Sequence, residues 1–507
     1  MAQVPGKEST SGPRSADLAD MRSWLANLRS QAQPANDAGH VMASHDAEQA
    51  RGPARTFVVS PTGPADYATA TEAIRKAPPE SRILIRPGRY DEGIVLDKSL
   101  EIIGDGPREE ILFENPDTHC VAVRTARALV RGLTLHSRGE SKGNRRSAVD
   151  IPEGELLLED CTLSSDTLPS VFVHGSRANP TIRRCRLLDG KASGIQVSDD
   201  ARATIEECEF LGNAEAGLLI RAGGNPVVRR CRFHDGKLFG LLVDEWGRGT
   251  VEECEFSAQA EAGIAISGGT PLVRKCRIHN ERVGLLAFAE GGGTLEECDF
   301  GDNEIGVLTA EGGNPLVRNC QIHDARIAGV SAKRKGRGTI EDCTISRCAK
   351  AGVHIIEVSN RIIRRCLVQD GPEFGIFVTA LGVGTIEECD ILGHGLAEVA
   401  VASDGNPLIR RCRLHDGKRF GLSVQLKGQA RVVDCDIYAN ALTGVLIRTH
   451  GSPTIRHCRI NRNKAEAVRV REQGTGTFED CDLTANGQGA WSIEANCRVQ
   501  SRGNKES

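Results

Sequence analysis

Cysteine is the residue type in this chain with the widest chemical range, and fifteen of the eighteen cysteines recur at a near-constant interval. The series runs from Cys161 to Cys481 in steps of 22, 23 or 24 residues. A zinc site needs four ligands that converge on one point, whereas this pattern supplies one thiol per unit. Free cysteine is among the residue types most often buried. The spacing therefore predicts an interior row of thiols in a repeat, with no metal site and no cofactor.

Histidine forms a second periodic set, in which each member follows a core position and two of the four begin a His-Asp-Gly segment. The members are His234, His279, His323 and His415. They could serve as metal ligands or general bases, but consecutive members are expected at least two turns apart, about 9.6 Å or more at the strand spacing. Ligands of one ion lie about 3–4 Å from each other. We therefore interpret these segments as corners, in which Asp and Gly form the turn.

Charged residues flank the cysteines in alternation, with RRCR around Cys185 and EECE around Cys208. If the cysteine points inward, the residue after it points outward, so stacked units place a positive rung between two negative ones. A phosphate approaching one arginine would meet carboxylates about 5 Å to either side. The pattern favours a ladder of salt bridges over a nucleic-acid surface. Each exposed pair contributes only about 0.2–1 kcal/mol, but a slip by one unit would turn every attraction into a repulsion.

The alternation lapses in the middle of the chain, where three uncharged residues occupy positions that call for Arg, Glu and Arg. A basic corner, Lys333 to Arg337, lies nearby in sequence, and Trp246 stands in another corner as an aromatic residue suited to stacking. Such a window predicts a binding patch, with drift in one repeat as the alternative. The candidate binding residues are Gln321, Thr344, Leu367, Lys333, Arg334, Lys335 and Trp246.

The elements that position these residues are short strands. One unit reads NPVVRRCRFHDGKLFGLLVDEWGRG from Asn225, and the next reads TVEECEFSAQAEAGIAISGG from Thr250. Each contains three apolar segments of strand character, separated by Gly, Asn, Asp and Pro corners. A period near 23 residues with three strands corresponds to one turn of a stacked array. We predict an all-β protein, a single-stranded, right-handed, three-sided parallel β-helix of about fifteen to eighteen coils.

The ends differ from the repeat. Residues 1–55 are expected to be a mostly disordered tail, in which Asp17 to Arg29 can form a short amphipathic helix. The β-helix is expected to span residues 56–495, opened by a short capping helix over Tyr67 to Lys76, because a bare edge invites aggregation. Residues 496–507 are predicted to be a C-terminal tail.

Two kinds of segment resemble a known superfamily. DYATATEAIRKAPPESRILIRPGRY and LEIIGDG, near the start, resemble the opening of pectin-lyase-like right-handed β-helix proteins, including pectin methylesterases. NPLIRRCRLHDG and GTIEECDILG resemble the repeats of the carbohydrate-binding and sugar hydrolase (CASH) group, found in an F-box protein and in bacterial proteins. The resemblance implies the fold over residues 56–495. It leaves function open, because the superfamily includes lyases, hydrolases, esterases, epimerases and non-catalytic binders.

The catalytic elements of pectin methylesterases are matched at one position. The family's QDTL segment corresponds to Ser165-Asp166-Thr167-Leu168, so the resemblance makes Asp166 the only catalytic candidate. The VDFIFG-type segment with the second aspartate is missing after Cys185, and so is the arginine-tryptophan element. The sequence therefore predicts no complete catalytic site.

The whole-chain properties narrow the function further. The net charge is −4 over 507 residues, which disfavours nucleic acid and anionic membranes as partners. No secretory signal is evident, so we expect a cytoplasmic protein, with non-classical secretion left open. We predict a non-catalytic scaffold that binds a protein partner along one flank. The alternative is a polysaccharide-acting or carbohydrate-binding protein with a site around Ser137 to Arg146 and Asp166.

Overall fold

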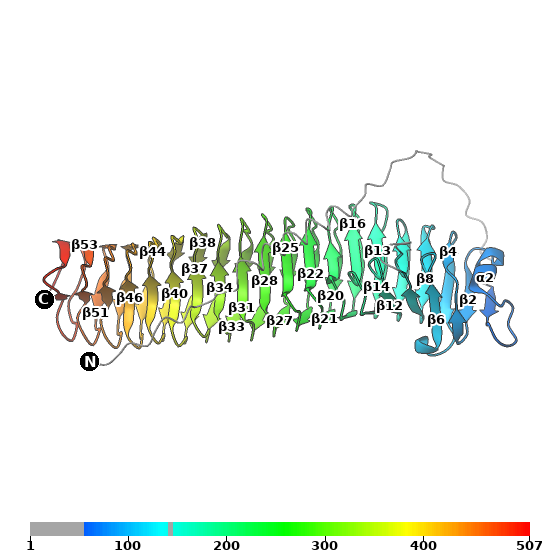
Figure 1. The fold of residues 1–507 in the computed structure, drawn as a ribbon, viewed down its shortest axis with the longest axis horizontal. Coiled ribbons are helices and arrows are strands. Elements are labelled where there is room, and N and C mark those ends of the chain that lie inside the picture. Colours follow the sequence, from blue (N-terminus) through cyan, green and yellow to red (C-terminus); the bar gives the residue numbers. More distant parts are fainter. Residues whose placement is uncertain (1–54, 140–145, 507) are drawn as a thin grey trace. The chain divides into compact units, whose positions relative to one another are not determined.

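The computed structural model describes residues 55–139 and 146–506. The expectations for the N-terminal tail, including the amphipathic helix, fall on residues 1–54 and lie outside the described residues. From Thr56 onward the chain winds through coil after coil in sequence order, as the colours of Figure 1 show. The right-handed parallel β-solenoid has about 19 turns and three sheets, which confirms the predicted fold class and slightly exceeds the predicted number of coils.

Each coil away from the two ends contributes one strand to each sheet. In a central coil β23 (Thr250–Glu252) belongs to sheet A, β24 (Glu255–Ser257) to sheet B and β25 (Ala262–Ser267) to sheet C. Each strand pairs in parallel with its counterpart in the next coil, so Val251 lies beside Val273 and Phe256 beside Ile278. Like residues therefore stack on like residues along the whole solenoid.

Stacked apolar columns form the interior. Val251, Phe256 and Ile264 are fully buried, and the rings of Phe210, Phe233 and Phe256 stack with centroids 4.4 and 4.7 Å apart. Each buried aliphatic or aromatic side chain contributes about 1.5–3 kcal/mol. Because each coil covers the core residues of the next, the solenoid is stabilised coil by coil.

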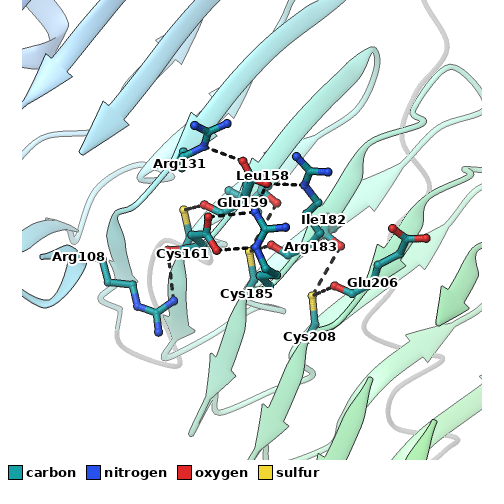
Figure 2. Close-up of polar contacts among 12 residues, drawn as sticks. Arg108, Arg131, Leu158, Glu159, Cys161, Ile182, Arg183, Cys185, Glu206 and Cys208 are labelled. Atoms are coloured by element: carbon teal, nitrogen blue, oxygen red, sulfur yellow. Dashed lines mark hydrogen bonds and ion pairs between the residues drawn. The ribbon is translucent and has the colours of Figure 1, made fainter. Parts of the chain in front are cut away.

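The thiol column lies inside the corner between sheets A and B, as the sequence predicts. All fifteen of its cysteines are free and at most 2% exposed. Figure 2 shows Cys161, Cys185 and Cys208 in this row; the Cys208 Sγ donates to the Glu206 carbonyl at 3.2 Å and contacts the Ile182 carbonyl at 3.6 Å. Burial raises the pKa of the Cys185 thiol well above its usual value. These thiols behave as small apolar side chains with a weak donor.

The two ends are closed differently. At the N-terminal end α2 (Ala70–Lys76) begins at the N-cap Thr69, whose side chain accepts from Glu72 N–H, and it packs against β4 (Ile94–Leu96). The predicted helix therefore starts three residues too early. At the other end β55 (Arg498–Arg502) pairs with β53 (Thr475–Glu479). The predicted boundary at residue 495 is wrong, because residues 498–502 add a strand to sheet A.

A ladder of buried amides, which the sequence analysis overlooked, follows the corner between sheets B and C. Asn463 Oδ1 accepts from Asn440 N–H at 3.1 Å, and Asn486 Oδ1 accepts from Asn463 N–H at 3.1 Å. Glu281 occupies the same ladder between Gln259 and Asn303, and burial raises its pKa to about 8. The recurrence of asparagine every 23 residues was the available signal.

The thiol column yields a prediction about reactivity. Seventeen cysteines are buried, and only Cys497 is half-buried. Because the exposed thiolate is the reactive species, we expect one of the eighteen thiols to react with Ellman's reagent in the native protein. All eighteen should react in guanidinium without reductant. Rapid reaction of several native thiols, or fewer than eighteen after unfolding, would contradict an interior row of free thiols.

Candidate functional site

The outer face of sheet A carries an almost unbroken alternation of charge. The last residue of each strand forms this column, and neighbouring members pair across coils. In Figure 2, Glu159 lies between Arg131 and Arg183, with nitrogen–oxygen distances of 2.6 and 2.5 Å. The column continues as Glu206, Arg229, Glu252, Arg274, Glu296, Arg318, Glu341, Arg364, Glu387 and Arg410. The predicted ladder is confirmed.

Glu159 illustrates the electrostatics of the ladder. Its carboxylate is 1% exposed and also contacts Arg184. Burial raises the pKa of this group, but hydrogen bonds from Arg183 and Arg131 outweigh burial and hold the pKa below its usual value. The carboxylate is therefore ionised at neutral pH, which suits an ion pair and not a general acid.

Two further columns repeat the alternation at the corner and on sheet B. At the corner Arg365 pairs with Asp342 at 2.8 Å. On sheet B Arg186 pairs with Glu209 at 2.7 Å. The charged faces of sheets A and B thus consist largely of neutralised pairs.

The neutral window occupies one column only. Gln321, Thr344 and Leu367 stack in register on sheet B, in β33 (Gln321–His323), β36 (Thr344–Ser346) and β39 (Leu367–Gln369). The neighbouring column on sheet A keeps its alternation of charge beside them. Arg318 pairs with Glu296 at 2.6 Å, and Arg364 pairs with Glu341. The window is a narrow break in an otherwise charged surface.

The other predicted binding residues lie elsewhere on the coil. Lys333, Arg334 and Lys335 follow β34 (Ala328–Ala332) of sheet C and precede β35 (Thr339–Glu341) of sheet A. This corner, here called the C–A corner, lies across the triangular cross-section from sheet B, so the structure does not join the basic segment to the window. Trp246 also lies at the C–A corner and is 80% exposed.

Exposed apolar side chains gather at the C–A corner, and sequence reasoning found only one of them. Val358 and Leu381 are 54% and 55% exposed, occupy the same position in consecutive coils, and have φ values of 60° and 61°. Leu426 is 49% exposed with φ of 51°. We call Val358, Leu381 and Leu426 the corner ridge. The signal was the presence of apolar residues where other coils carry Gly, Asp or Lys.

Asp166 follows β12 (Thr162–Ser165) on sheet B, in a small polar cluster that the sequence did not reveal. Ser164 Oγ and His136 Nδ1 are hydrogen-bonded at 2.7 Å, and His136 Nε2 lies 3.7 Å from the Asp166 carboxylate. His136 reaches Ser164 because β9 (Thr134–Ser137) pairs with β12 in register. A serine beside a histidine is the beginning of a nucleophilic arrangement, but the aspartate is beyond hydrogen-bonding distance.

A groove of about 620 Å³ crosses the outer face of sheet A near the N-terminal end. Its floor includes Leu129 and Leu157, which are neighbours in the paired strands β8 (Arg127–Arg131) and β11 (Glu155–Glu159). Two of its carboxylates face arginines, with Arg82–Glu101 at 2.8 Å and Arg127–Glu155 at 3.7 Å. Asp166 does not line this groove.

The periodic histidines lie against carboxylates. His323 lies 2.8 Å from Asp299 and 2.6 Å from Asp324. Burial lowers the pKa of His323, but hydrogen bonds to Asp324 and Asp299 outweigh it and raise the pKa. His415 contacts Asp390 and Asp416 in the same way. Within residues 55–139 and 146–506 no group of three His, Cys, Asp or Glu side chains is placed to hold a metal ion.

Three parallel sheets around interior apolar and thiol columns define a right-handed parallel β-helix protein. The family described as "right handed beta helix region" matches residues 121–272, 240–363, 269–395 and 363–505, and the chain belongs to this family. Among the helices of the described residues, none is both long and apolar enough to span a bilayer.

Solved structures of low identity resemble the chain. The mannuronan C-5 epimerase AlgE6 A-module of Azotobacter vinelandii is 13% identical, with 86% of this chain and 93% of that chain covered and a TM-score of 0.31. The N-terminal fragment of bacteriophage Phi29 gene product 12 is 10% identical over 85% and 89%, with a TM-score of 0.39. Pectate lyase Pel9A is 13% identical over 57% and 78%, with a TM-score of 0.35. No residue role is transferred from them.

The ladder yields a prediction about stability. Glu159→Ala leaves Arg131 and Arg183 without their shared carboxylate, and we expect a loss of about 2 kcal/mol in the free energy of unfolding at pH 7. Because the pKa of Glu159 is lowered in the folded state, its contribution is present above pH 4.5 and falls as acid titrates it. The difference between wild type and variant should therefore shrink below pH 4.

The matched control is Glu155→Ala in the same strand. The Arg127–Glu155 pair spans 3.7 Å, and its side chains are 75% and 61% exposed. Removal of this pair should change the free energy of unfolding by less than about 0.5 kcal/mol. Chemical denaturation at pH 7 and pH 3.5 measures both variants, and equal effects would contradict the assigned role of Glu159.

Proposed function

We propose that this protein is a non-catalytic scaffold that binds a protein partner through the corner ridge. The observation that carries the proposal is Val358, a β-branched residue in a left-handed backbone conformation with more than half of its surface exposed. Such a conformation is strained for valine, and an exposed valine recovers little through burial. The corner has a positive φ in every coil from Asp200 to Gln473, and Val358 is the β-branched residue at this position, which points to selection for another purpose.

The other coils show that the fold requires this backbone conformation but does not require an aliphatic residue in it. The same corner position holds Gly223, Gly268 and Gly312, each with positive φ. Glycine adopts this conformation without a steric penalty. Leu381 repeats the exception one coil after Val358, so two apolar side chains stand about 4.8 Å apart on the outside of the solenoid. A pair of adjacent exposed apolar residues fits a contact surface better than drift in one coil.

Charged residues near the ridge indicate the chemistry of the partner's contact surface. Lys335 occupies the same corner position one coil before Val358, and its N–H donates to the Glu357 carbonyl at 3.3 Å. Lys427 occupies this position two coils after Leu381, beyond Asp404. Exposed Glu357 and Asp404 lie at the same corner, so the complementary partner surface is apolar with charged side chains of both signs at its edge. Ile362, 39% exposed on sheet A, extends the apolar area.

The ion-pair ladders favour binding over catalysis. General acid catalysis needs a carboxyl group with a raised pKa near its substrate. On the faces of sheets A and B, the pKa values of Glu159, Glu209 and Asp342 are lowered by paired cations. We also place the protein in a reducing compartment, because seventeen buried cysteines are free.

The cluster of Ser164, His136 and Asp166 supports a second candidate function. Its hydrogen bond of 2.7 Å between Ser164 and His136 could activate a hydroxyl nucleophile toward an ester of a polysaccharide. The arrangement is incomplete as an acyl-transfer site, because the carboxylate lies 3.7 Å from the ring nitrogen. Carbohydrate binding at this cluster is therefore the alternative to the scaffold.

The scaffold proposal predicts that removal of the ridge side chains weakens partner binding and leaves thermal stability unchanged or higher. In the Val358→Gly/Leu381→Gly variant, each new residue is one that other coils already use at this position. The variant should unfold at the same temperature as wild type or higher. Loss of two buried apolar contacts should weaken partner binding about 10- to 100-fold. Affinity purification from the source organism, with quantitative mass spectrometry, identifies the partner, and titration of the purified pair measures the affinity.

The control for the ridge is Leu367→Arg, which restores the charge alternation in the neutral window. It should fold normally and retain the partner. If Leu367→Arg loses the partner while the glycine variant retains it, the contact surface is the window and not the ridge. If wild type retains no protein above the level of the glycine variant, the scaffold proposal fails.

The second candidate has its own test. We expect purified protein to show no turnover of polyuronides, their methyl esters or acetylated sugars above that of Ser164→Ala and Asp166→Ala. Release of acid, methanol or acetate and the appearance of unsaturated products measure this. A turnover that both substitutions abolish while the melting temperature is unchanged would establish the enzyme in place of the scaffold.

A further inference from the structure

An arginine lies inside the solenoid, at the C–A corner. Arg361 is the second residue of β38 (Asn360–Arg364), and it is fully buried. Asn360 and Ile362 are exposed whereas Ser359, Arg361 and Ile363 are buried, so the alternation of the strand directs Arg361 inward. Arginine is rarely buried without a paired acid. This residue takes no part in the charge ladders outside.

The guanidinium is only partly satisfied by its surroundings. Arg361 Nη2 donates to Thr309 Oγ1 at 2.6 Å and to the Arg337 carbonyl at 3.1 Å. Both acceptors are uncharged. Nε and Nη1 are buried and have no hydrogen-bond partner among residues 55–139 and 146–506. Burial lowers the pKa of Arg361 to about 9, still above neutral pH. The group therefore remains a cation with three N–H bonds unused.

The surrounding columns have made room for this side chain. Thr309 belongs to an inward column of sheet C that reads Ile266, Ala287, Thr309, Ala332 and Ile355 in successive coils. Alanine at 332 lets Arg361 reach past one coil to Thr309. Ala287, Ala332 and the Thr309 hydroxyl are found where the described residues have their one inward arginine at this corner. The sequence of the column is therefore adapted to the arginine side chain.

A second departure from the repeat lies beside the first. Ser359 occupies a position that is Gly336 in the coil before and Gly382 in the coil after. It is fully buried, and its Oγ has no hydrogen-bond partner among the described residues. Ser359 and Arg361 are two residues apart in extended chain, so their side chains lie on the same side of the strand. This corner thus contains guanidinium N–H groups and a serine O–H group that have no acceptor among the described residues.

We propose that Arg361 and Ser359 bind a small inorganic monovalent anion, such as chloride, inside the C–A corner. An unpaired buried charge is strongly unfavourable, and an anion supplies the missing charge while it accepts the unused N–H and O–H groups. Electrostatic pairing in the interior is stronger than at the surface. The anion would be a structural part of this corner, on the inner side of the segment that carries Val358.

The experiment uses the full chain and bromide as the probe. Because the corner is closed, the protein is unfolded and refolded in sodium bromide, sodium chloride or sodium gluconate at one ionic strength. Crystals of bromide-refolded protein are examined by anomalous diffraction. We expect a bromide peak within about 3.5 Å of Arg361 Nε or Nη1. We also expect a melting temperature about 1–2 °C higher in chloride than in gluconate.

Variants assign the effect to these residues. In Arg361→Met the difference between chloride and gluconate should vanish, and in Ser359→Gly, which restores the residue of the neighbouring coils, it should decrease. Arg364→Met, an outward arginine of the same strand that pairs with Glu341, is the matched control and should retain the full difference. An anion effect that persists in Arg361→Met overturns the proposal. If that variant does not fold, bromide-refolded wild-type crystals without an anomalous peak at Arg361 overturn it equally.

Discussion

The structure depends on parallel pairing of each coil with the next, which keeps identical positions in register at the strand spacing. Because the side chains of one coil lie directly against those of its neighbours, a residue is favourable only if it suits the residues one coil before and after it. Apolar residues form continuous columns, the phenylalanines from Phe210 to Phe256 stack face to face, and the thiols form one interior row. The same constraint sets arginine beside glutamate on the outside.

Alternation of charge is the specific outcome of this constraint. Two coil types are needed, one basic and one acidic, since two like coils in contact would bring equal charges about 4.8 Å apart. Each surface pair is weak, but a shift of one coil would convert all of them to repulsions. The ladder from Arg131 to Arg410 therefore specifies which coil pairs with which more than it raises the total stability. It also keeps buried carboxylates such as that of Glu159 ionised.

In such an array, departures from the columns are informative. The corner segment from Val358 to Arg361 departs from the columns at three positions. An apolar residue in a strained conformation faces outward, a serine faces inward in place of glycine, and an arginine faces inward in place of the glycine or proline of nearby coils. The outward change supports the proposed contact surface, and the inward change supports the proposed anion. A repeat protein can vary one coil in this way because the columns elsewhere preserve the fold.

The period, the three strands per coil, the inward thiols and the alternation of charge could all be predicted from the sequence, because each is a pattern along the chain that stacking only repeats. The ends were predicted less well, since α2 starts at Ala70 and β55 extends to Arg502. Which segments share a face became clear only from the three-dimensional arrangement of the coils. Gln321 and Lys335 are close in sequence but lie on opposite sides of the coil, on sheet B and at the C–A corner. His136 contacts Ser164, and Arg361 contacts Thr309, because the register of the coils brings residues that are distant in sequence together. Such contacts depend on the number of residues in each coil and on the direction of each side chain, which periodicity alone does not specify.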